Sequence, residues 1–328
     1  MVASAASNYP NGFSNGVVIR DIPLVQAHPG KAFWVSNNTA LLQGTVAGSD
    51  GNKGTFQSPF ATLAYALTQC KANRGDIIFV KPGHAEAVTS ATSLGFAVAG
   101  VAIVGLGAGS ARPKLTFTTA NTATIAVSAD NVSLQNFQVV GNFLSIASAF
   151  TVAAAANLAI ENCSFSDTSA ILGFLSIITT TVSVNSDNLR YVNNDRISIA
   201  TTSPGPDIVV ANTMTGLTVC DNSSTHLVAS NNVAALIEHG ALVMTNAKVL
   251  RNYVFSVNTD TATGAVLLKT TAITGSGMVA HNRVRALDIA AAIIVPAVAV
   301  QYGLFDNLYI GDGTSNSGFV LPAIGSDA

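Results

Sequence analysis

The most constraining feature of the sequence is a short motif that returns at nearly regular intervals from residue 134 onward. The motif is an apolar residue, any residue and then Asn or Asp, and seven copies at near-regular spacing end at Asn136, Asn162, Asn193, Asp221, Asn252, Asn282 and Asn307. The intervals are 26, 31, 28, 31, 30 and 25 residues, and the stretches between the copies carry strand patterns without helices. This period is typical of one coil of a parallel β-solenoid, in which stacked coils bury a continuous core.

A recurrent Asn has a physical reason in such a fold. Asn tolerates the left-handed backbone region, and its side chain can hydrogen-bond the backbone of the next coil. Stacked Asn side chains can also bond one another as a ladder. A single match would mean little in a chain this rich in Asn, but seven matches at near-regular spacing are hard to obtain by chance. We therefore expect the seven motif residues to form one structural Asn/Asp ladder.

The chain is poor in charge, and this excludes several classes of protein. Only 10% of its 328 residues are charged, and the formal net charge is −2, whereas about 25% is typical of soluble domains. A basic nucleic-acid surface, a charge-rich disordered region and a coiled coil are all disfavoured. The charge-free run at 143–160 predicts buried strands rather than a membrane span.

One helix precedes the strands. Ser58 and Pro59 have the pattern of an N-cap followed by proline at the first helical position. Apolar residues then recur at spacings of three and four, and Arg74-Gly75 ends the pattern. The sequence therefore predicts a helix within residues 58–75, followed by a strand over residues 76–80.

These residues carry a resemblance to a known superfamily. The run Ser-Pro-Phe-Ala-Thr-Leu from Ser58 and the run Gly-Asp-Ile-Ile-Phe-Val-Lys-Pro-Gly ending at Gly83 resemble the start of the pectate-lyase-like parallel β-helices. The resemblance implies an all-β, single-stranded right-handed parallel β-helix of about seven to nine coils, with a short N-terminal helix capping its open end. We expect a loop-rich segment at 1–57 that docks to neighbouring chains, the capping helix at 58–75, the β-helix at 76–312 and a C-terminal tail or cap at 313–328.

A narrower resemblance concerns the leading segment. Residues Asn8–Phe13 and Ile22–Trp34 are similar to the leading segment of β-helical virion proteins of tailed bacteriophages. This implies a structural protein on the virion surface, a decoration or cement subunit that binds the major capsid protein or other virion subunits, made in the host cytoplasm. A homotrimer is expected, with 295–300 and 318–322 as candidate contact or end-capping segments. The alternatives are a tail spike or fibre that binds or cleaves host surface polysaccharide, and a free polysaccharide lyase.

Catalytic residues are scarce. Enzymes of this superfamily gather carboxylates and basic residues on one strand face, but this chain has three Glu, scattered Asp and no Asp-x-Asp run. The candidate site is His281, Arg283 and Arg285 on one strand face, with Asp306 one coil later at the position equivalent to His281. It could bind sugar or transfer protons, but a solvated face with one stacked His–Asp pair is the preferred interpretation. The residues favour a non-enzymatic role.

No cofactor or metal is expected. Cys70, Cys163 and Cys220 lack metal-ligand spacing. The Gly-rich run at 105–109 is not followed by a helical pattern, so it does not predict a phosphate site. The dispersed basic residues do not predict a nucleic-acid partner.

Overall fold

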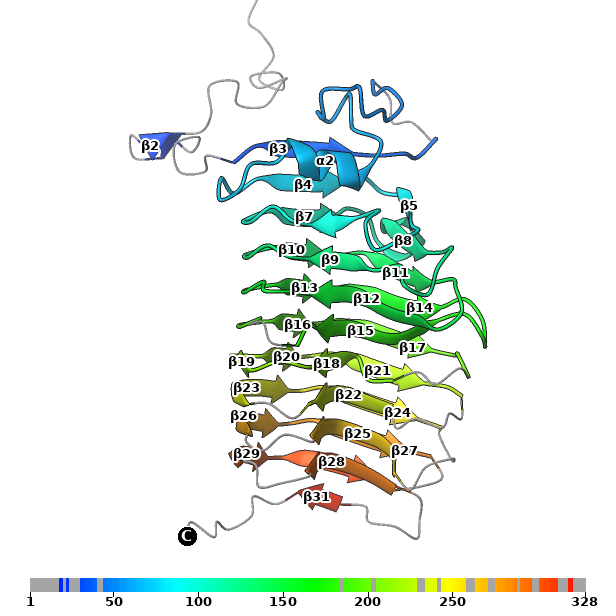
Figure 1. Ribbon diagram of the computed structural model, residues 1–328, viewed down its shortest axis with the longest axis vertical. Helices are drawn as coiled ribbons and strands as arrows, with labels where there is room; N and C mark the ends of the chain where they lie inside the picture. The colour runs from blue at the N-terminus through cyan, green and yellow to red at the C-terminus, as the bar shows by residue number, and fades with distance from the viewer. Residues whose placement is uncertain are drawn as a thin grey trace, which may run out of the picture.

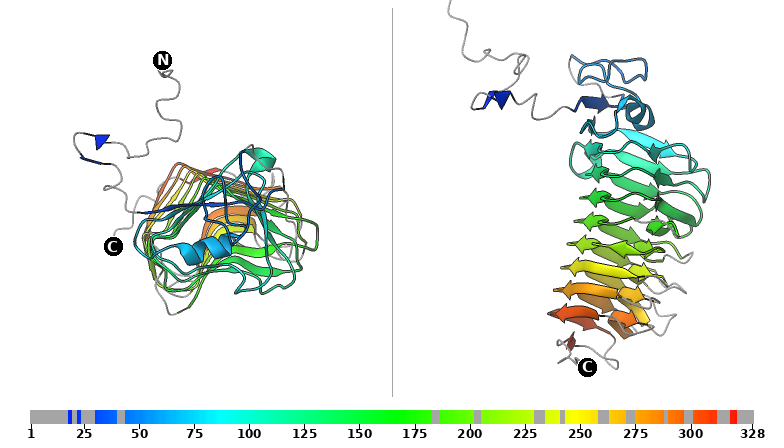
Figure 2. Two further views of the ribbon diagram at one scale, coloured as in Figure 1. Left: turned by 90° about the horizontal axis from the view of Figure 1, so that it is seen from above. Right: turned by 60° about the vertical axis from the view of Figure 1, so that its left-hand side comes forward.

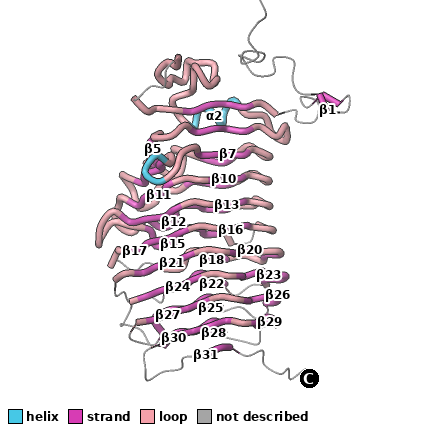
Figure 3. Tube along the Cα trace, turned by 180° about the vertical axis from the view of Figure 1, so that it is seen from behind, coloured by secondary structure: helices cyan, strands magenta, loops and turns pink. Residues whose placement is uncertain are grey.

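The chain folds into a right-handed parallel β-solenoid, whose strands stack as the rungs of a prism (Figures 1 and 3). The computed structural model describes residues 18–19, 22–23, 30–39, 44–182, 186–201, 205–228, 234–240, 243–257, 263–270, 275–287, 290–296, 301–311 and 318–320. Residues 297–300 of the contact segment predicted at 295–300, and most of the tail predicted at 313–328, lie outside these residues. Seen from above, the coils superimpose around one central core (Figure 2).

The coils are built from three sheets of 11, 10 and 8 strands, and the 8 strands of the third agree with the predicted seven to nine coils. The first sheet contains β3 (Ala32–Val35), β4 (Ile77–Val80), β7 (Ala102–Gly105), β10 (Ser133–Gln135), β13 (Ala159–Glu161), β16 (Arg190–Val192), β19 (Met214–Thr215), β20 (Thr218–Cys220), β23 (Met244–Leu250), β26 (Gly275–Ala280) and β29 (Gln301–Phe305).

The second sheet contains β5 (Ala85–Val88), β8 (Lys114–Phe117), β11 (Gln138–Gly141), β14 (Ser164–Asp167), β17 (Asp195–Ser198), β21 (Ser223–His226), β24 (Tyr253–Ser256), β27 (Arg283–Ala286), β30 (Asn307–Ile310) and β31 (Gly318–Val320). The third contains β6 (Gly95–Phe96), β9 (Ile125–Val127), β12 (Ile146–Val152), β15 (Phe174–Thr180), β18 (Ile208–Val210), β22 (Ala234–His239), β25 (Thr263–Thr270) and β28 (Ala290–Pro296). A separate antiparallel pair joins β1 (Val18–Ile19) and β2 (Ile22–Pro23).

The core is a set of stacked inward rows, as period-2 strands with one buried face require. Along the first sheet, parallel pairing places seven inward side chains directly above one another, each fully buried: Ile103, Leu134, Ile160, Tyr191, Val219, Val249 and Val279. The charge-free run at 143–160 contributes β12 and the start of β13, in agreement with the prediction of buried strands. Within the described residues, no helix is long and apolar enough to cross a membrane.

The helix near the N-terminus is shorter than predicted and begins later. Helix α2 spans Leu63–Gln69, and its N-cap is Thr62, whose hydroxyl accepts the backbone N–H of Tyr65. Ser58 and Pro59 therefore do not cap it. The reason is a tertiary contact: Phe60 is drawn into an extended conformation beside β3, where its N–H donates to the carbonyl oxygen of Trp34 and its carbonyl accepts the N–H of Ser36.

The segments predicted at both ends of the chain contain strands. β3 lies inside the predicted loop-rich segment 1–57, where it pairs in parallel with β4 and continues the first sheet. At the other end, β31 lies inside the predicted tail 313–328 and pairs with β30 in the antiparallel sense. Within the predicted contact segment 295–300, residues 295–296 belong to β28, which pairs with β25 inside the third sheet.

The predicted single ladder is wrong in register, because the structure contains two adjacent rows at the turn between the first and second sheets. The pairing of Cys220 with Leu250 makes Asp221 equivalent to Arg251, not to Asn252. The outer row is therefore Asn136, Asn162, Asn193, Asp221, Arg251, His281 and Asp306. The inner row, one residue later, contains Asn194, Asn222, Asn252, Asn282 and Asn307.

Candidate functional site

The outer row changes character along the solenoid. In its first three members, Asn162 donates to Asn136 and Asn193 donates to Asn162, each through Nδ2 to Oδ1 at 3.3 Å. The later members are ionisable and pair two by two. Arg251 binds Asp221 with two hydrogen bonds of 2.7 Å, and His281 Nδ1 lies 2.8 Å from Asp306 Oδ2.

The backbone makes this change unusual. Every member of the outer row has a positive φ, including 55° at Arg251, 57° at His281 and 48° at Asp306. Asn, Asp and His adopt this left-handed conformation more often than other side-chain-bearing residues, whereas Arg does so rarely. Residues held in sparsely populated backbone regions cluster at functional sites. The part of the outer row from Asp221 to Asp306, which contains Arg251, is therefore a candidate site on geometric grounds.

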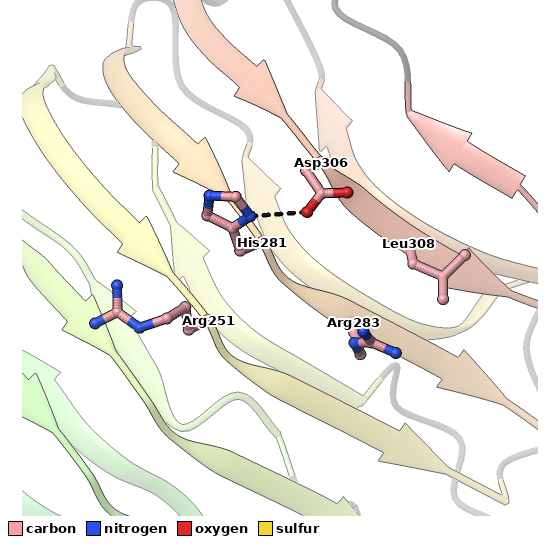
Figure 4. Close-up of a pocket in the computed structure, with 5 residues that line it drawn as sticks. All are labelled: Arg251, His281, Arg283, Asp306 and Leu308. Atoms are coloured by element: carbon pink, nitrogen blue, oxygen red, sulfur yellow. Dashed lines mark hydrogen bonds and ion pairs between the residues drawn. The ribbon is translucent and has the colours of Figure 1, made fainter.

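A groove lies at this place (Figure 4). It has a volume of about 470 Å³ and is lined by Arg251, His281, Arg283, Asp306 and Leu308. The side chains of His281 and Asp306 are about half exposed, at 47% and 53%. The lining comes from three successive coils at the C-terminal end, because Arg251 follows β23, Arg283 opens β27 and Leu308 lies in β30.

The inner Asn row forms a rigid support beneath the groove. Asn252, Asn282 and Asn307 are at most 2% exposed. Asn282 Oδ1 accepts the backbone N–H of Asn252 at 2.9 Å, and Asn307 Oδ1 accepts that of Asn282 at 3.0 Å. Their Nδ2 atoms donate to carbonyl oxygens of the first sheet, at Val219, Val249 and Val279. These bonds fix the backbone from which the groove side chains project.

Apolar and aromatic side chains lie on the strands next to the groove residues, and we define them as the rim: Tyr253, Phe255, Met278, Phe305 and Ile310. Met278 and Phe305 are more than half exposed, at 54% and 58%. The Phe305 ring packs edge-on against His281 at 5.3 Å, and Arg285 lies over the Phe255 ring at 5.8 Å. Arg285 thus belongs to the surroundings of the groove rather than to its lining.

The groove can bind an anion, but it lacks the groups of a glycosidase. Asp306 is its one carboxylate, and His281 contacts it. Asp221, the other acid of the row, is three coils away, about 14 Å at the usual strand spacing, and its bond with Arg251 lowers its pKa. Paired catalytic carboxylates lie about 5–10 Å apart. The described residues contain no group of three potential metal ligands among His, Cys, Asp and Glu.

Sequence reasoning found most of this site but missed Arg251. His281, Arg283 and Asp306 come together as lining residues, and Asp306 is equivalent to His281 through the pairing of Ala280 with Phe305. Arg251 was hidden because the motif selects Asn252, its neighbour. The 30-residue interval from Asp221 would have located it, had the two rows been separated.

The other polar positions have structural roles. His84 is buried and lies 3.1 Å from Glu86, whose carboxylate accepts the N–H of Leu63 at the start of α2. The cysteines are free thiols, and burial raises the pKa of Cys70 and Cys163 to about 12.

A second polar cluster lies inside the core, where the sequence pattern gave no signal. Arg196 and Asp207 are at most 1% exposed and form an ion pair of 2.9 Å. Ser224 Oγ donates to Asp207 at 2.8 Å, and His226 Nε2 lies 3.3 Å from Ser224 Oγ. Solvent and substrates do not reach this cluster, so it is part of the core rather than a candidate site.

Comparison with known proteins supports the fold and gives no information on function. No known family model matches the sequence, and neither does any curated protein. Among solved structures, a rhamnogalacturonan lyase superposes with a TM-score of 0.54 at 15% identity, over 89% of this chain and 78% of that one. A pectate lyase gives a TM-score of 0.41 at 12% identity over 82% of this chain and 78% of that one, too weak to add to the first. The chain therefore has the parallel β-helix fold of such lyases, a likeness at this identity of fold alone.

Proposed function

We propose that this chain is a structural, non-enzymatic virion protein of a tailed bacteriophage, a decoration subunit that binds and stabilises the head shell. The observation that carries the proposal is the composition of the groove and its rim. Exposed Met, Phe and Tyr side chains beside arginines are typical of protein–protein interfaces, and the groove has one carboxylate where hydrolysis needs two. The leading-segment resemblance adds the virion context.

The proposal includes partners and location. The chain sits on the particle surface and binds the major capsid protein or another virion subunit, without nucleic acid or membrane. It associates as a homotrimer, because an elongated prism with small-residue faces can pack around a threefold axis. Sedimentation of the purified protein tests this part, and a monomer at micromolar concentration contradicts it.

Deletion of the gene from the phage that encodes it tests the main proposal. Particles that lack the protein should lose their DNA at a lower temperature and survive osmotic shock less well, while adsorbing to cells normally. Addition of purified protein should restore stability, and gold-labelled antibodies should decorate the whole head. Normal stability with failed adsorption, and label only at the tail, contradicts the proposal.

The second candidate is a tail spike or fibre that binds host glycan. One observation favours it: His281, Asp306 and Arg283 offer hydrogen-bonding groups beside the exposed Phe305 ring, an arrangement that can hold a sugar. A free polysaccharide lyase is the third candidate, and no group of three potential metal ligands among the described residues favours it. Incubation with acidic polysaccharides should leave their chain length unchanged.

A further inference from the structure

We propose that the groove is the docking site for an acidic peptide segment of the protein on which this chain assembles, with Arg283 binding a carboxylate of that segment. This inference rests on the proposed function and names the contact that function would use. It is carried by charge, rigidity and the chemistry of the rim.

One cation of the groove has no ion-pair partner among the described residues. Arg251 is paired with Asp221 and His281 with Asp306, but Arg283 has no ion pair within the described part of the chain. Its side chain is exposed and lines the groove. A guanidinium presents a planar fork of donors that fits a carboxylate with two parallel hydrogen bonds. The groove therefore has one cation available for an incoming acid.

The site is held in place before any partner arrives. The buried hydrogen bonds made by the side-chain amides of the inner Asn row fix three consecutive coils beneath the groove. Asp221 orients Arg251 by two short bonds, and Asp306 orients His281. Pre-ordered side chains lose little conformational entropy on binding, so more of the contact energy appears as affinity.

The aliphatic members of the rim favour a peptide over a sugar or a nucleotide. Met278 and Ile310 are exposed aliphatic side chains at 54% and 39%, and Leu308 lies in the groove itself. Flexible aliphatic surface packs well against the apolar side chains of a peptide. A glycan is held instead by hydroxyl hydrogen bonds and by flat aromatic platforms.

The departure from the Asn pattern is the independent sign that these residues were selected for contact. Asn at 136, 162 and 193 satisfies the turn by itself, so the fold has no need of Arg or His at the equivalent positions. Both nevertheless occur, Arg251 in a backbone conformation that costs it energy, and both line the groove.

The test uses particles that lack this protein and purified protein added back. The variant is Arg283→Gln, and the matched control is Lys114→Gln, which removes the same charge from the same outward row at the other end of the second sheet. Arg283→Gln should weaken binding to the particles about tenfold or more, as expected for a lost charge pair at an interface. Lys114→Gln should bind like wild type, and both variants should unfold at the wild-type urea concentration.

A second arm identifies the source of the carboxylate. Excess hexaglutamate should displace the wild-type protein from the particles, and hexaglutamine should not. Equal binding of wild type and Arg283→Gln overturns the docking site while the decoration function stands. Failure of the wild-type protein to bind particles overturns both. Binding of wild type to immobilised uronic-acid oligosaccharide, lost in Arg283→Gln and without particle binding, overturns both in favour of the glycan-binding alternative.

Discussion

Residues with positive φ show what each turn of the solenoid requires. Within the described residues, Asn supplies eight of the fourteen non-glycine positions with positive φ. Three of them, Asn131, Asn157 and Asn188, form a further exposed row between the third and first sheets, with Nδ2–Oδ1 distances of 2.8 and 3.0 Å. The fold therefore places Asn residues with positive φ at two of its turns, between the first and second sheets and between the third and first sheets. Arg251 and His281 are exceptions to this pattern.

Replacement of these exceptions by Asn should leave stability intact. We expect Arg251→Asn to unfold within about 1 kcal/mol of wild type, on the stabilising side, because relief of the left-handed backbone offsets a surface ion pair worth about 0–1 kcal/mol. His281→Asn should also stay within about 1 kcal/mol of wild type, because Asn and His both accept positive φ and the exposed contact with Asp306 contributes little. The reverse change, Asn162→Arg, should destabilise by about 1 kcal/mol. Urea denaturation at neutral pH measures all three. A marked loss of stability in His281→Asn would show that His281 serves the fold and not a contact.

The residue scale also shows where sequence reasoning stops. The 25–31-residue period located the coils, because burial on one face repeats with the chain. It could not separate the two rows, since Asn193 is followed by Asn194 and Asp221 by Asn222, and either member fits the motif. Only the register of the strands, a long-range property, assigns Arg251 to the outer row.

At the scale of elements, contacts between strands decided the structure in places where the local sequence predicted something else. Ser58 and Pro59 have the chemistry of a helix start, yet the bonds of Phe60 to Trp34 and Ser36 keep this segment extended. The polar core cluster is a second case. Arg196 is inward on β17, in the row of Val139 and Phe165, where alternation predicts an apolar residue.

The buried pair should be strongly coupled. Arg196→Met alone should lower the free energy of unfolding by about 3–5 kcal/mol, because it leaves the Asp207 carboxylate buried without its cation. The double variant Arg196→Met, Asp207→Leu should recover a large part of the loss. A double-mutant cycle from urea denaturation measures the coupling. If the losses simply add, the two groups do not act as a pair.

At the scale of the whole molecule, one continuous core makes buried histidines matter for global stability. Burial, and then the nearby Arg196 guanidinium, hold the pKa of His226 well below 6.5, and burial lowers the pKa of His239 to about 4. The unfolded chain therefore takes up these protons as pH falls through 6.5, before the folded chain does. Stability is present above pH 6.5 and is lost toward pH 4.

We expect the free energy of unfolding to fall by up to about 1.4 kcal/mol per pH unit for each such histidine. Burial also raises the pKa of Asp207, which acts in the opposite direction, so the informative quantity is a difference. His226→Leu should show a shallower pH dependence than wild type between pH 6.5 and 5, measured by urea denaturation at each pH. Identical slopes contradict the assignment to His226.

Because the strands stack at a constant spacing, the number of coils determines the length of the solenoid. Nine steps separate β3 from β29 in the first sheet, and at the usual strand spacing they span about 43 Å. The groove lies at the β29 end, and the strand that follows the N-terminal segment lies at the other (Figure 1). A molecule held at its groove would therefore present its opposite end at a fixed reach, and each coil gained or lost would alter that reach by about 4.8 Å. The number of coils therefore sets the distance between the two ends of the solenoid.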